Sequence, residues 1–371
     1  MGVETKASRG GWAAADSLQE LSYLVTTAGA DVVGMFSQKL DRPSPTHYIG
    51  RGKITELVSL KEQTQYNTVI LDDELSPRQQ RNLEEILEVK VIDRTALILD
   101  IFAKQARTHE GQLQVELAQH RYLLPRLVGQ WSHLERLGAG IGTRGPGESQ
   151  LETDRRLIHQ RINRLQHEIE HVRQHRAVYR KRRKEAGVPI VALVGYTNAG
   201  KSTLFNALSQ AGVAVEDKLF STLDPVTRCL TSPNGQRFLM TDTVGFIHKL
   251  PPSIVAAFRA TLEELGEADL LLHMVDITHK NAANQCRTVE QILTELRLEH
   301  KPKITVFNKL DLALDSEQKM EGLTSVPFLE EQIMLPDGNI ALISATEGWG
   351  VGKLVDKITS RLEGSRIRVF S

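Results

Sequence analysis

Eight residues near the middle of the chain have the composition and spacing of a phosphate-binding loop. They follow the apolar run Ile190–Val194 and lead into a helix-like stretch, Thr203–Leu208, which is the context that such a loop requires. Its glycines allow backbone N–H groups to curl around phosphate oxygens, and the helix N-terminus adds a partial positive charge. A plain glycine-rich turn is the less favoured alternative. The expected nucleotide-binding residues here are Gly195, Tyr196, Thr197, Asn198, Ala199, Gly200, Lys201, Ser202 and Thr203.

Two further segments carry groups suited to a metal ion and a γ-phosphate. Lys201 is expected to neutralise phosphate oxygens, and the hydroxyls of Ser202 and Thr222 are expected to ligate Mg²⁺. Asp242 would hold the Mg²⁺ shell through water, and the Gly245 N–H would meet the γ-phosphate. The expected catalytic groups are therefore Lys201, Thr222 and Gly245. The segments comprise Phe220, Ser221, Thr222, Leu223 and Asp224, and then Asp242, Thr243, Val244 and Gly245.

A fourth motif predicts which base is bound. The Asp311 carboxylate can accept hydrogen bonds from guanine N1–H and the exocyclic amine, whereas adenine offers no such pair. A site built to pair a polar group rejects the analogue that lacks it by ~10⁴ or more. Asn308 is expected to tie this loop to the phosphate-binding loop. The base-binding set comprises Asn308, Lys309, Leu310 and Asp311, backed by Ser344, Ala345 and Thr346, and the four motifs in this order predict a GTPase.

The residue after Gly245 bears on the mechanism. Many GTPases place a water-orienting glutamine there, but this chain has Phe246, which cannot polarise water. We therefore expect slow intrinsic hydrolysis. Activation could come from a partner surface that reorganises the loops around the γ-phosphate. A second hypothesis is a K⁺ ion held near Asn198, because the loop resembles that of potassium-activated members of the TrmE-Era group.

Composition and charge limit the class of protein. The 371 residues predict two or three domains. Two cysteines indicate neither a disulfide framework nor a metal site, and no run reaches the ~20 apolar residues of a membrane span, so we expect a cytoplasmic protein. The net charge is zero, but residues 104–185 carry 17 basic against 9 acidic residues, a net charge of +8. This basic segment indicates a polyanionic partner.

Hydrophobic periodicity predicts three parts. Residues 1–104 are expected to form a small α/β domain, with strands at 31–36, 68–71 and 89–92 and a capping box at Ser17–Glu20. Residues 105–187 are expected to form a helical hairpin. Residues 188–371 are expected to form the GTPase domain, an α/β fold with a doubly wound, mostly parallel sheet whose strands lie near 190–194, 237–242, 270–275, 303–307 and 340–343.

The predicted hairpin has two apolar seams and an unusual loop. The seams comprise Leu113, Leu117, His120, Leu124 and Leu127, then Leu151, Ile158, Ile162, Leu165, Ile169, Val172 and Tyr179. His167, His171 and His175 share one face, where a solvated polar stripe is favoured over a metal site. The loop at 129–149 holds six glycines with Trp131, His133, Arg136 and Arg144. Its composition suits contact with irregular RNA and equally suits a disordered surface connection.

Residues 145–156 carry a family resemblance. The run Gly-Pro-Gly-Glu-Ser-Gln-Leu-Glu-Thr-Asp-Arg-Arg resembles the signature of the HflX GTPase family, with Ser149 in place of the usual threonine. The segments at 222–225 and 242–246 resemble that family's switch sequences. The resemblance implies a GTPase that binds the large ribosomal subunit and its rRNA, with the hairpin loop reaching toward the peptidyl-transferase region. The best-understood members split stalled or idle ribosomes when GTP is bound.

Two other functions stay open. One is a GTP-dependent assembly factor or RNA-binding chaperone that matures the large subunit without splitting anything. The other is a partner in RNA modification, which is less favoured because neither Cys229 nor Cys286 has catalytic surroundings. We expect a monomer that associates with the ribosome.

Overall fold

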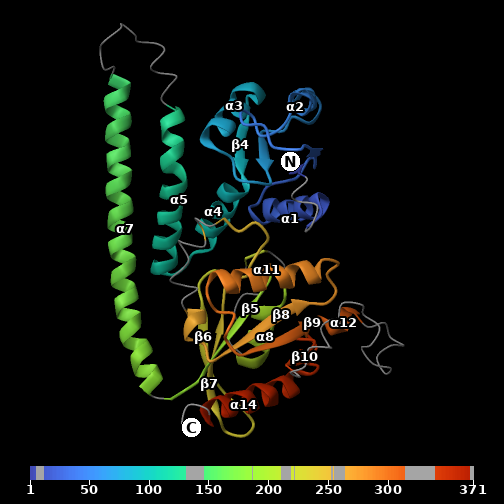
Figure 1. Ribbon diagram of the computed structural model, residues 1–371, viewed down its shortest axis with the longest axis vertical. Helices are drawn as coiled ribbons and strands as arrows, with labels where there is room; N and C mark the ends of the chain where they lie inside the picture. The colour runs from blue at the N-terminus through green and yellow to red at the C-terminus, as the bar shows by residue number, and fades with distance from the viewer. Residues whose placement is uncertain are drawn as a thin grey trace. The chain divides into compact units, whose positions relative to one another are not determined.

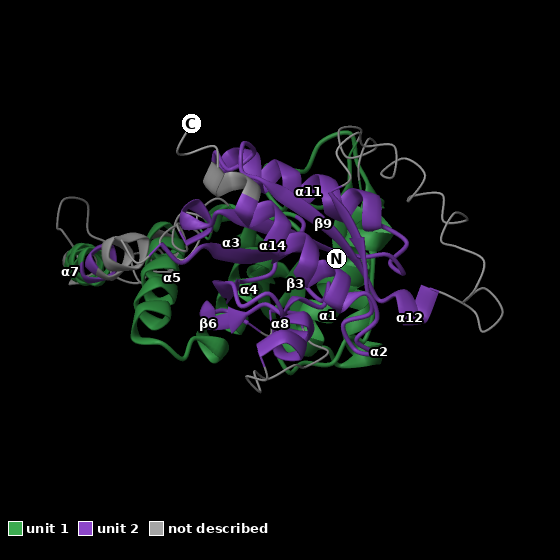
Figure 2. Cartoon of the chain, turned by 90° about the horizontal axis from the view of Figure 1, so that it is seen from below, with its two compact units in different colours: residues 1–174, 249–258 green, residues 175–248, 259–371 purple. Residues whose placement is uncertain are grey.

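The computed structural model describes residues 1–5, 12–130, 146–185, 187–209, 219–220, 222–251, 254, 264–313 and 339–367. Two compact units are distinguished in Figure 2. The first contains residues 1–174 together with 249–258, and the second contains residues 175–248 and 259–371. Helices and strands carry the labels of Figure 1.

The first unit opens with an α/β domain. Its strands are β1 (Gly2–Glu4), β2 (Ser37–Lys39), β3 (Thr68–Leu71) and β4 (Lys90–Asp93), and its helices are α1 (Ala14–Thr27), α2 (Arg51–Thr64), α3 (Pro77–Leu87) and α4 (Arg94–Gln105). β1 pairs with β2 and β3 pairs with β4, both in parallel. The Met1 ammonium donates to the Ile70 carbonyl at 2.8 Å, and the Asp72 N–H donates to the Met1 carbonyl at 2.9 Å. The pairs are separate two-stranded sheets, and these bonds join Met1, ahead of β1, to Ile70 of β3 and to Asp72 just after it.

Two expectations for this domain are wrong. Residues 31–36 form no strand, and Val32, Val33 and Met35 are 41%, 63% and 50% exposed, because pairing begins only at Ser37. The Ser17–Glu20 capping box also fails, because α1 already begins at Ala14. A capping box is present instead at Ser76, ahead of α3. The sequence pattern alone does not distinguish a helix-capping pair from two polar residues whose side chains make long-range contacts in the fold.

The polar side chains of α1 enter a buried ionic cluster around Arg94, which is 1% exposed. Arg94 pairs with Asp72 at 2.8 Å and with Glu20, and the Ser17 hydroxyl donates to Asp72 at 2.6 Å. The Lys249 ammonium adds a contact to the Asp72 carboxylate at 2.6 Å. Burial alone would raise the pKa of Asp72, but Arg94 and Lys249 outweigh it and hold this pKa below its usual value. Each buried charge in this cluster thus has a partner of opposite sign.

The helical hairpin consists of α5 (His109–Gln130) and α7 (Pro146–Glu185), which lie side by side in Figure 1; residues 175–185 of α7 are counted with the second unit. The predicted seam is confirmed in its central part, where the buried core comprises Leu113, Leu117, Ile162 and Leu165, flanked by Leu124, Ile158 and Ile169. Arg161 of α7 donates to the Glu116 carboxylate of α5 at 2.7 Å. Residues 131–145, which hold most of the glycine-rich loop, lie outside the described residues.

Near its C-terminal end, α5 is fixed to the α/β domain by Arg126. The guanidinium donates to the Asp93 carboxylate at 3.1 Å and to the Leu75 carbonyl at 2.7 Å. It also lies 3.5 Å from the ring centroid of Tyr122, a cation–π contact. Asp93 is fully buried and caps α4 through the Ala96 N–H. The hairpin and the α/β domain therefore share one set of buried polar contacts.

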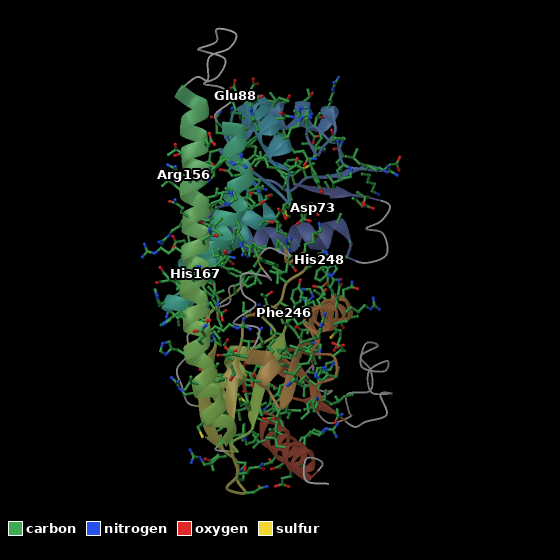
Figure 3. The ribbon with its side chains drawn as sticks, turned by 60° about the vertical axis from the view of Figure 1, so that its left-hand side comes forward. Asp73, Glu88, Arg156, His167, Phe246 and His248 are labelled. Atoms are coloured by element: carbon green, nitrogen blue, oxygen red, sulfur yellow. The ribbon has the colours of Figure 1, made fainter. Side chains whose placement is uncertain are left out.

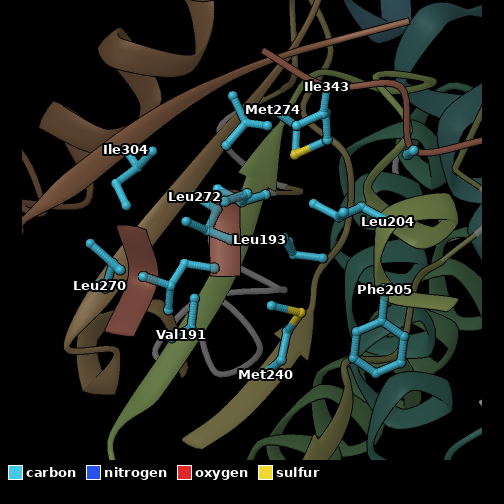
Figure 4. Close-up of a cluster of buried hydrophobic side chains, with 14 of the residues drawn as sticks. Val191, Leu193, Leu204, Phe205, Met240, Leu270, Leu272, Met274, Ile304 and Ile343 are labelled. Carbon is cyan, nitrogen blue, oxygen red and sulfur yellow. The ribbon is translucent and has the colours of Figure 1, made fainter. Parts of the chain in front are cut away.

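The second unit is built on a six-stranded sheet in the order β10-β9-β8-β5-β7-β6, parallel except for β6. Its core residues, among them Val191, Leu193, Phe205, Met240 and Leu272, are shown in Figure 4. The predicted α/β fold with a mostly parallel sheet is confirmed. The strands are β5 (Ile190–Gly195), β6 (Val226–Thr231), β7 (Arg237–Asp242), β8 (Leu270–Asp276), β9 (Lys303–Asn308) and β10 (Ile340–Leu342), and the helices are α8 (Lys201–Ser209), α11 (Ala282–Glu295), α12 (Leu310–Ala313) and α14 (Val351–Ile367).

Two features are absent from the described part of the chain. None of its helices is both long and apolar enough to cross a bilayer. The same residues contain no group of three or more metal-ligating His, Cys, Asp or Glu side chains, and His167, His171 and His175 are exposed on α7. Cys229 is a free, exposed thiol and Cys286 a free, buried one.

Candidate nucleotide-binding site

The phosphate-binding loop runs from the end of β5 to the start of α8, as predicted. Gly200 has φ +87°, and a Cβ built on it would lie 2.1 Å from Asn308 Nδ2. Asn198 adopts φ 61°, the left-handed region that asparagine tolerates better than most residues, and it is exposed. The backbone N–H groups at the start of α8 point out of the helix end, where they can bind an anion.

Lys201 points back into this loop. Its ammonium donates to the Tyr196 carbonyl at 2.8 Å, and the residue is 5% exposed. Burial lowers the pKa of Lys201 to about 8, partly opposed by the charge of Asp242. A phosphate anion bound beside the ammonium would favour its charged form. The geometry thus places one buried cation beside the backbone that would cradle phosphates.

Three oxygen-bearing side chains converge next to Lys201. The Ser202 hydroxyl donates to Asp242 Oδ2 at 2.6 Å, the Thr222 hydroxyl donates to the same atom at 3.0 Å, and the two hydroxyls lie 2.8 Å apart. Burial raises the pKa of Asp242, while both hydroxyls oppose the shift. Asp242 Oδ1 is buried with no hydrogen-bond partner in the described residues. Hydroxyl and carboxylate oxygens are the donors that Mg²⁺ prefers, so this set fits that ion.

The segment after Asp242 packs directly on the phosphate-binding loop. Phe246 N–H donates to the Gly195 carbonyl at 3.0 Å, and Thr197 N–H donates to the Phe246 carbonyl at 2.8 Å. A Cβ on Gly245 would lie 2.9 Å from Thr197 Cα and 3.0 Å from the Lys201 ammonium. Phe246 is 1% exposed, so its ring belongs to the core. Thr243 supports the segment through a 2.6 Å hydrogen bond to the Leu193 carbonyl, and Val244 is buried.

The predicted base-binding segments meet at Asn308. Its Nδ2 donates to the Ala199 carbonyl at 3.0 Å, and its Oδ1 accepts from the Ala345 N–H at 3.0 Å. The contact with the phosphate-binding loop is the one expected from the sequence, and the same amide also connects this loop with the segment after β10. Asp311 lies half-buried in the first turn of α12, next to buried Leu310.

The structure adds Asp276, which the sequence patterns did not single out. It ends β8, and its carboxylate pairs with the Lys309 ammonium at 2.7 Å. Its other oxygen accepts from the N–H and hydroxyl of Thr278 at 2.9 and 2.6 Å. Its position at the carboxyl end of a predicted parallel strand could have identified it as a site residue, because ligand sites of doubly wound sheets form at that edge.

The other predicted residues lie around these groups. Phe220 and Leu223 are buried on either side of Thr222, Ser221 lies outside the described residues, and Asp224 is half-buried before β6. Thr203 follows Ser202 in α8. The Ser344 hydroxyl accepts from the Glu347 N–H at 3.1 Å, and Thr346 is exposed.

A phosphate-binding loop, an oxygen cluster beside its lysine and an asparagine-tethered loop at one edge of a doubly wound sheet define a P-loop GTPase. Three protein-family models match the chain: GTP-binding GTPase N-terminal at residues 15–103, GTP-binding GTPase Middle Region at 105–183, and 50S ribosome-binding GTPase at 190–309. The chain belongs to the HflX family of GTPases, and the GTPase activity predicted from its motifs is thereby supported.

The similarity extends along most of the chain. GTPase HflX of Caldanaerobacter subterraneus subsp. tengcongensis is 54% identical over 297 residues, which cover 80% of this chain and 69% of that protein. GTPase HflX of Escherichia coli is 44% identical over 349 residues, 94% of this chain and 80% of that protein. The crystal structure of a GTP-binding protein from Sulfolobus solfataricus in complex with GDP is 26% identical, covers 98% of each chain and has a TM-score of 0.48.

Proposed function

We propose that this GTPase binds the large ribosomal subunit through its rRNA and, with GTP bound, splits stalled or idle ribosomes, hydrolysis then driving release. In this proposal it acts as a monomer in the cytoplasm. The 50S ribosome-binding GTPase family model, which matches residues 190–309, supports the choice of partner. The observation that carries the proposal is the basic character of the helical hairpin.

That character is exposed along α7. Arg155, Arg156, Arg164 and Arg173 are all exposed on this helix, and Figure 3 labels Arg156 on it. The surrounding segment, residues 104–185, has a net charge of +8. Two of these arginines also contact acidic neighbours within α7, Arg164 with Glu168 and Arg173 with Glu170. Exposed cations that neutralise RNA phosphates release counterions, so binding should weaken as salt concentration rises.

The phosphates of GTP would lie on the loop between β5 and α8. Lys201 would neutralise the β- and γ-phosphate oxygens, and the Gly245 N–H would donate to the γ-phosphate. Ser202 and Thr222 would hold Mg²⁺ directly, with Asp242 behind a water ligand. Bound there, the ion would neutralise charge on the phosphate oxygens. The close packing of Gly245 on Thr197 supports a γ-phosphate contact at this point.

Asp311 would select guanine by accepting hydrogen bonds from N1–H and the exocyclic amine. Asn308 would keep the Asp311 loop in register with the phosphate-binding loop, because its amide contacts Ala199. Lys309, held by Asp276 at 2.7 Å, would cover the base. Ser344, Ala345 and Thr346 would supply main-chain donors. We further propose that the side chain of Asn198 helps to bind K⁺ near the β- and γ-phosphates.

Hydrolysis should be slow without a partner. Phe246 is in the core, and its ring has no group that could orient the attacking water. In the proposed cycle, GTP and Mg²⁺ order the Thr222 and Gly245 segments and favour the ribosome-bound conformation. Hydrolysis removes the γ-phosphate contacts, so the bound conformation loses its advantage.

Sucrose-gradient sedimentation of assembled ribosomes tests the proposal. Purified protein with a non-hydrolysable GTP analogue should reduce the assembled peak, raise both subunit peaks and sediment with the large subunit. Arg155→Gln combined with Arg156→Gln should weaken the effect, whereas Arg287→Gln combined with Arg297→Gln, both exposed in the second unit, is the matched charge control. If the assembled peak survives while the protein sediments with free large subunits, the splitting function is wrong and an assembly factor is favoured.

A further inference from the structure

The side chain of Tyr196 reaches from the phosphate-binding loop to the segment that follows Gly245. Its phenol oxygen accepts a hydrogen bond from the His248 backbone N–H at 2.6 Å, and the residue is 4% exposed. Its own carbonyl accepts from the Lys201 ammonium at 2.8 Å. Tyr196 therefore contacts both the buried lysine and the segment that carries Gly245.

The phenol contact differs in kind from the backbone contacts beside it. Tyr196 and Phe246 form a parallel β-bridge, with hydrogen bonds from Phe246 N–H to Gly195 and from Thr197 N–H to Phe246. Those bonds use main-chain atoms and would form with other residues at position 196. The bond to His248 lies two residues beyond Phe246 and needs a side chain of this length with an acceptor at its end. Figure 3 labels Phe246 and His248, the two ends of this stretch.

We propose that Tyr196 is a positioning residue for GTP hydrolysis, which fixes residues 245–248 against the phosphate-binding loop and orients the Gly245 N–H before the hydrolysis step. Donors that are already oriented toward developing charge do not have to reorganise during the reaction, which is why preorganised loops accelerate it. GDP lacks the γ-phosphate, so its affinity does not depend on the position of residues 245–248. The inference rests on the proposed role of Gly245 at the γ-phosphate.

The test is Tyr196→Phe, which keeps the ring and the backbone bridge and removes the acceptor. We expect kcat for GTP and the affinity for a non-hydrolysable GTP analogue each to fall about three- to tenfold, the effect of one lost hydrogen bond. The affinity for GDP should change by less than about twofold. Tyr66→Phe is the matched control: its phenol donates to the Leu57 carbonyl at 2.8 Å in the first unit, so its loss should leave all three values unchanged.

Other outcomes would overturn the proposal. If GDP and the GTP analogue lose affinity equally while Tm falls, Tyr196 only packs the core. If kcat is unchanged or rises, the phenol does not prepare the segment for hydrolysis. Gly245→Ala distinguishes a failure of the proposed Gly245 role from a failure of the Tyr196 role. It disturbs Gly245 itself, because the added Cβ would meet Thr197 Cα at 2.9 Å. If that variant keeps the wild-type preference for the GTP analogue over GDP, the role of Gly245 fails. If it loses the preference while Tyr196→Phe does not, the Tyr196 inference alone fails.

Discussion

Asn308 Nδ2 fills the space that a side chain at Gly200 would need, since a Cβ there would lie 2.1 Å away. The asparagine amide can reach the Ala199 carbonyl only because the neighbouring residue is a glycine. The φ of +87° at Gly200 imposes the same requirement independently. The link between Asn308 and the loop after β5 thus depends on the absence of a methyl group at Gly200.

Gly200→Ala should therefore disrupt nucleotide binding. The left-handed backbone alone costs a residue with a side chain roughly 1–2 kcal/mol, and the overlap with Asn308 adds to it. We expect the affinity for fluorescent GDP to fall at least about tenfold. Gly352→Ala is the matched control, because Gly352 lies in α14 with nothing within 4 Å of the added Cβ. Equal affinities for both variants would show that the contact with Asn308 is dispensable.

Asp311→Asn should change the base preference. An asparagine can donate to the 2-oxo group of xanthine but cannot accept both guanine donors, so xanthosine triphosphate should replace GTP as the preferred substrate. The change in preference between GTP and xanthosine triphosphate should be of the order of 10⁴-fold, measured as the ratio of their kcat/KM values. Asp356→Asn, exposed on α14, serves as a charge control. Unchanged use of GTP by Asp311→Asn would contradict the assignment of the base site.

Turnover should depend on the monovalent cation. If Asn198 helps to hold K⁺, GTP turnover will be several-fold higher in K⁺ than in Na⁺ buffers of equal ionic strength, and Asn198→Ala will remove that difference. Asn234→Ala, which alters an exposed turn between β6 and β7, should retain it. Equal turnover in the two buffers for the unaltered protein would rule out the potassium hypothesis.

His273 should make stability depend on mildly acidic pH. Burial lowers its pKa below the ordinary 6.5, although Glu290, whose carboxylate lies 3.4 Å away, opposes the shift. Lys303, which pairs with Glu290, favours the neutral imidazole. As pH falls below 6.5 the unfolded chain takes up a proton that the folded one resists, so the free energy of unfolding falls, by at most about 1.4 kcal/mol per pH unit.

Urea denaturation between neutral pH and pH 4.5 measures this dependence. His273→Gln should flatten it, since glutamine has no proton to gain. His300→Gln, in the exposed turn before β9, should leave the slope as it is. Glu290 contributes at the acid end of this range, because hydrogen bonds that outweigh burial lower its pKa from 4.5 to about 2, so the slopes are compared above about pH 5.5, where it is ionised in both states. Identical slopes for the unaltered chain and His273→Gln would show that the histidine is not responsible.

The sequence predicted those parts of the site whose chemistry is local. Short sequence motifs contain Lys201, Ser202 and Asn308, and the buried strands beside them are continuous apolar runs in the sequence. It did not predict β6, because Val226–Thr231 is a largely exposed edge strand with polar residues. The local pattern wrongly predicts a helix cap at Ser17, because the Ser17 hydroxyl contacts Asp72, 55 positions away, and no local pattern encodes such a partner. The phenol contact of Tyr196 was missed for the same reason.

Arg126 has a consequence for how the first unit would engage a large partner. By joining α5 to Asp93 and Leu75, it couples the helical hairpin to the α/β domain, so that a partner contacting both in the proposed function would meet one bivalent ligand. Once either surface is bound, the other is held at a high effective concentration, so avidity can far exceed the affinity of each contact. Loosening Arg126 would therefore weaken attachment without removing any residue that touches the partner, and the loss would appear mainly as faster dissociation.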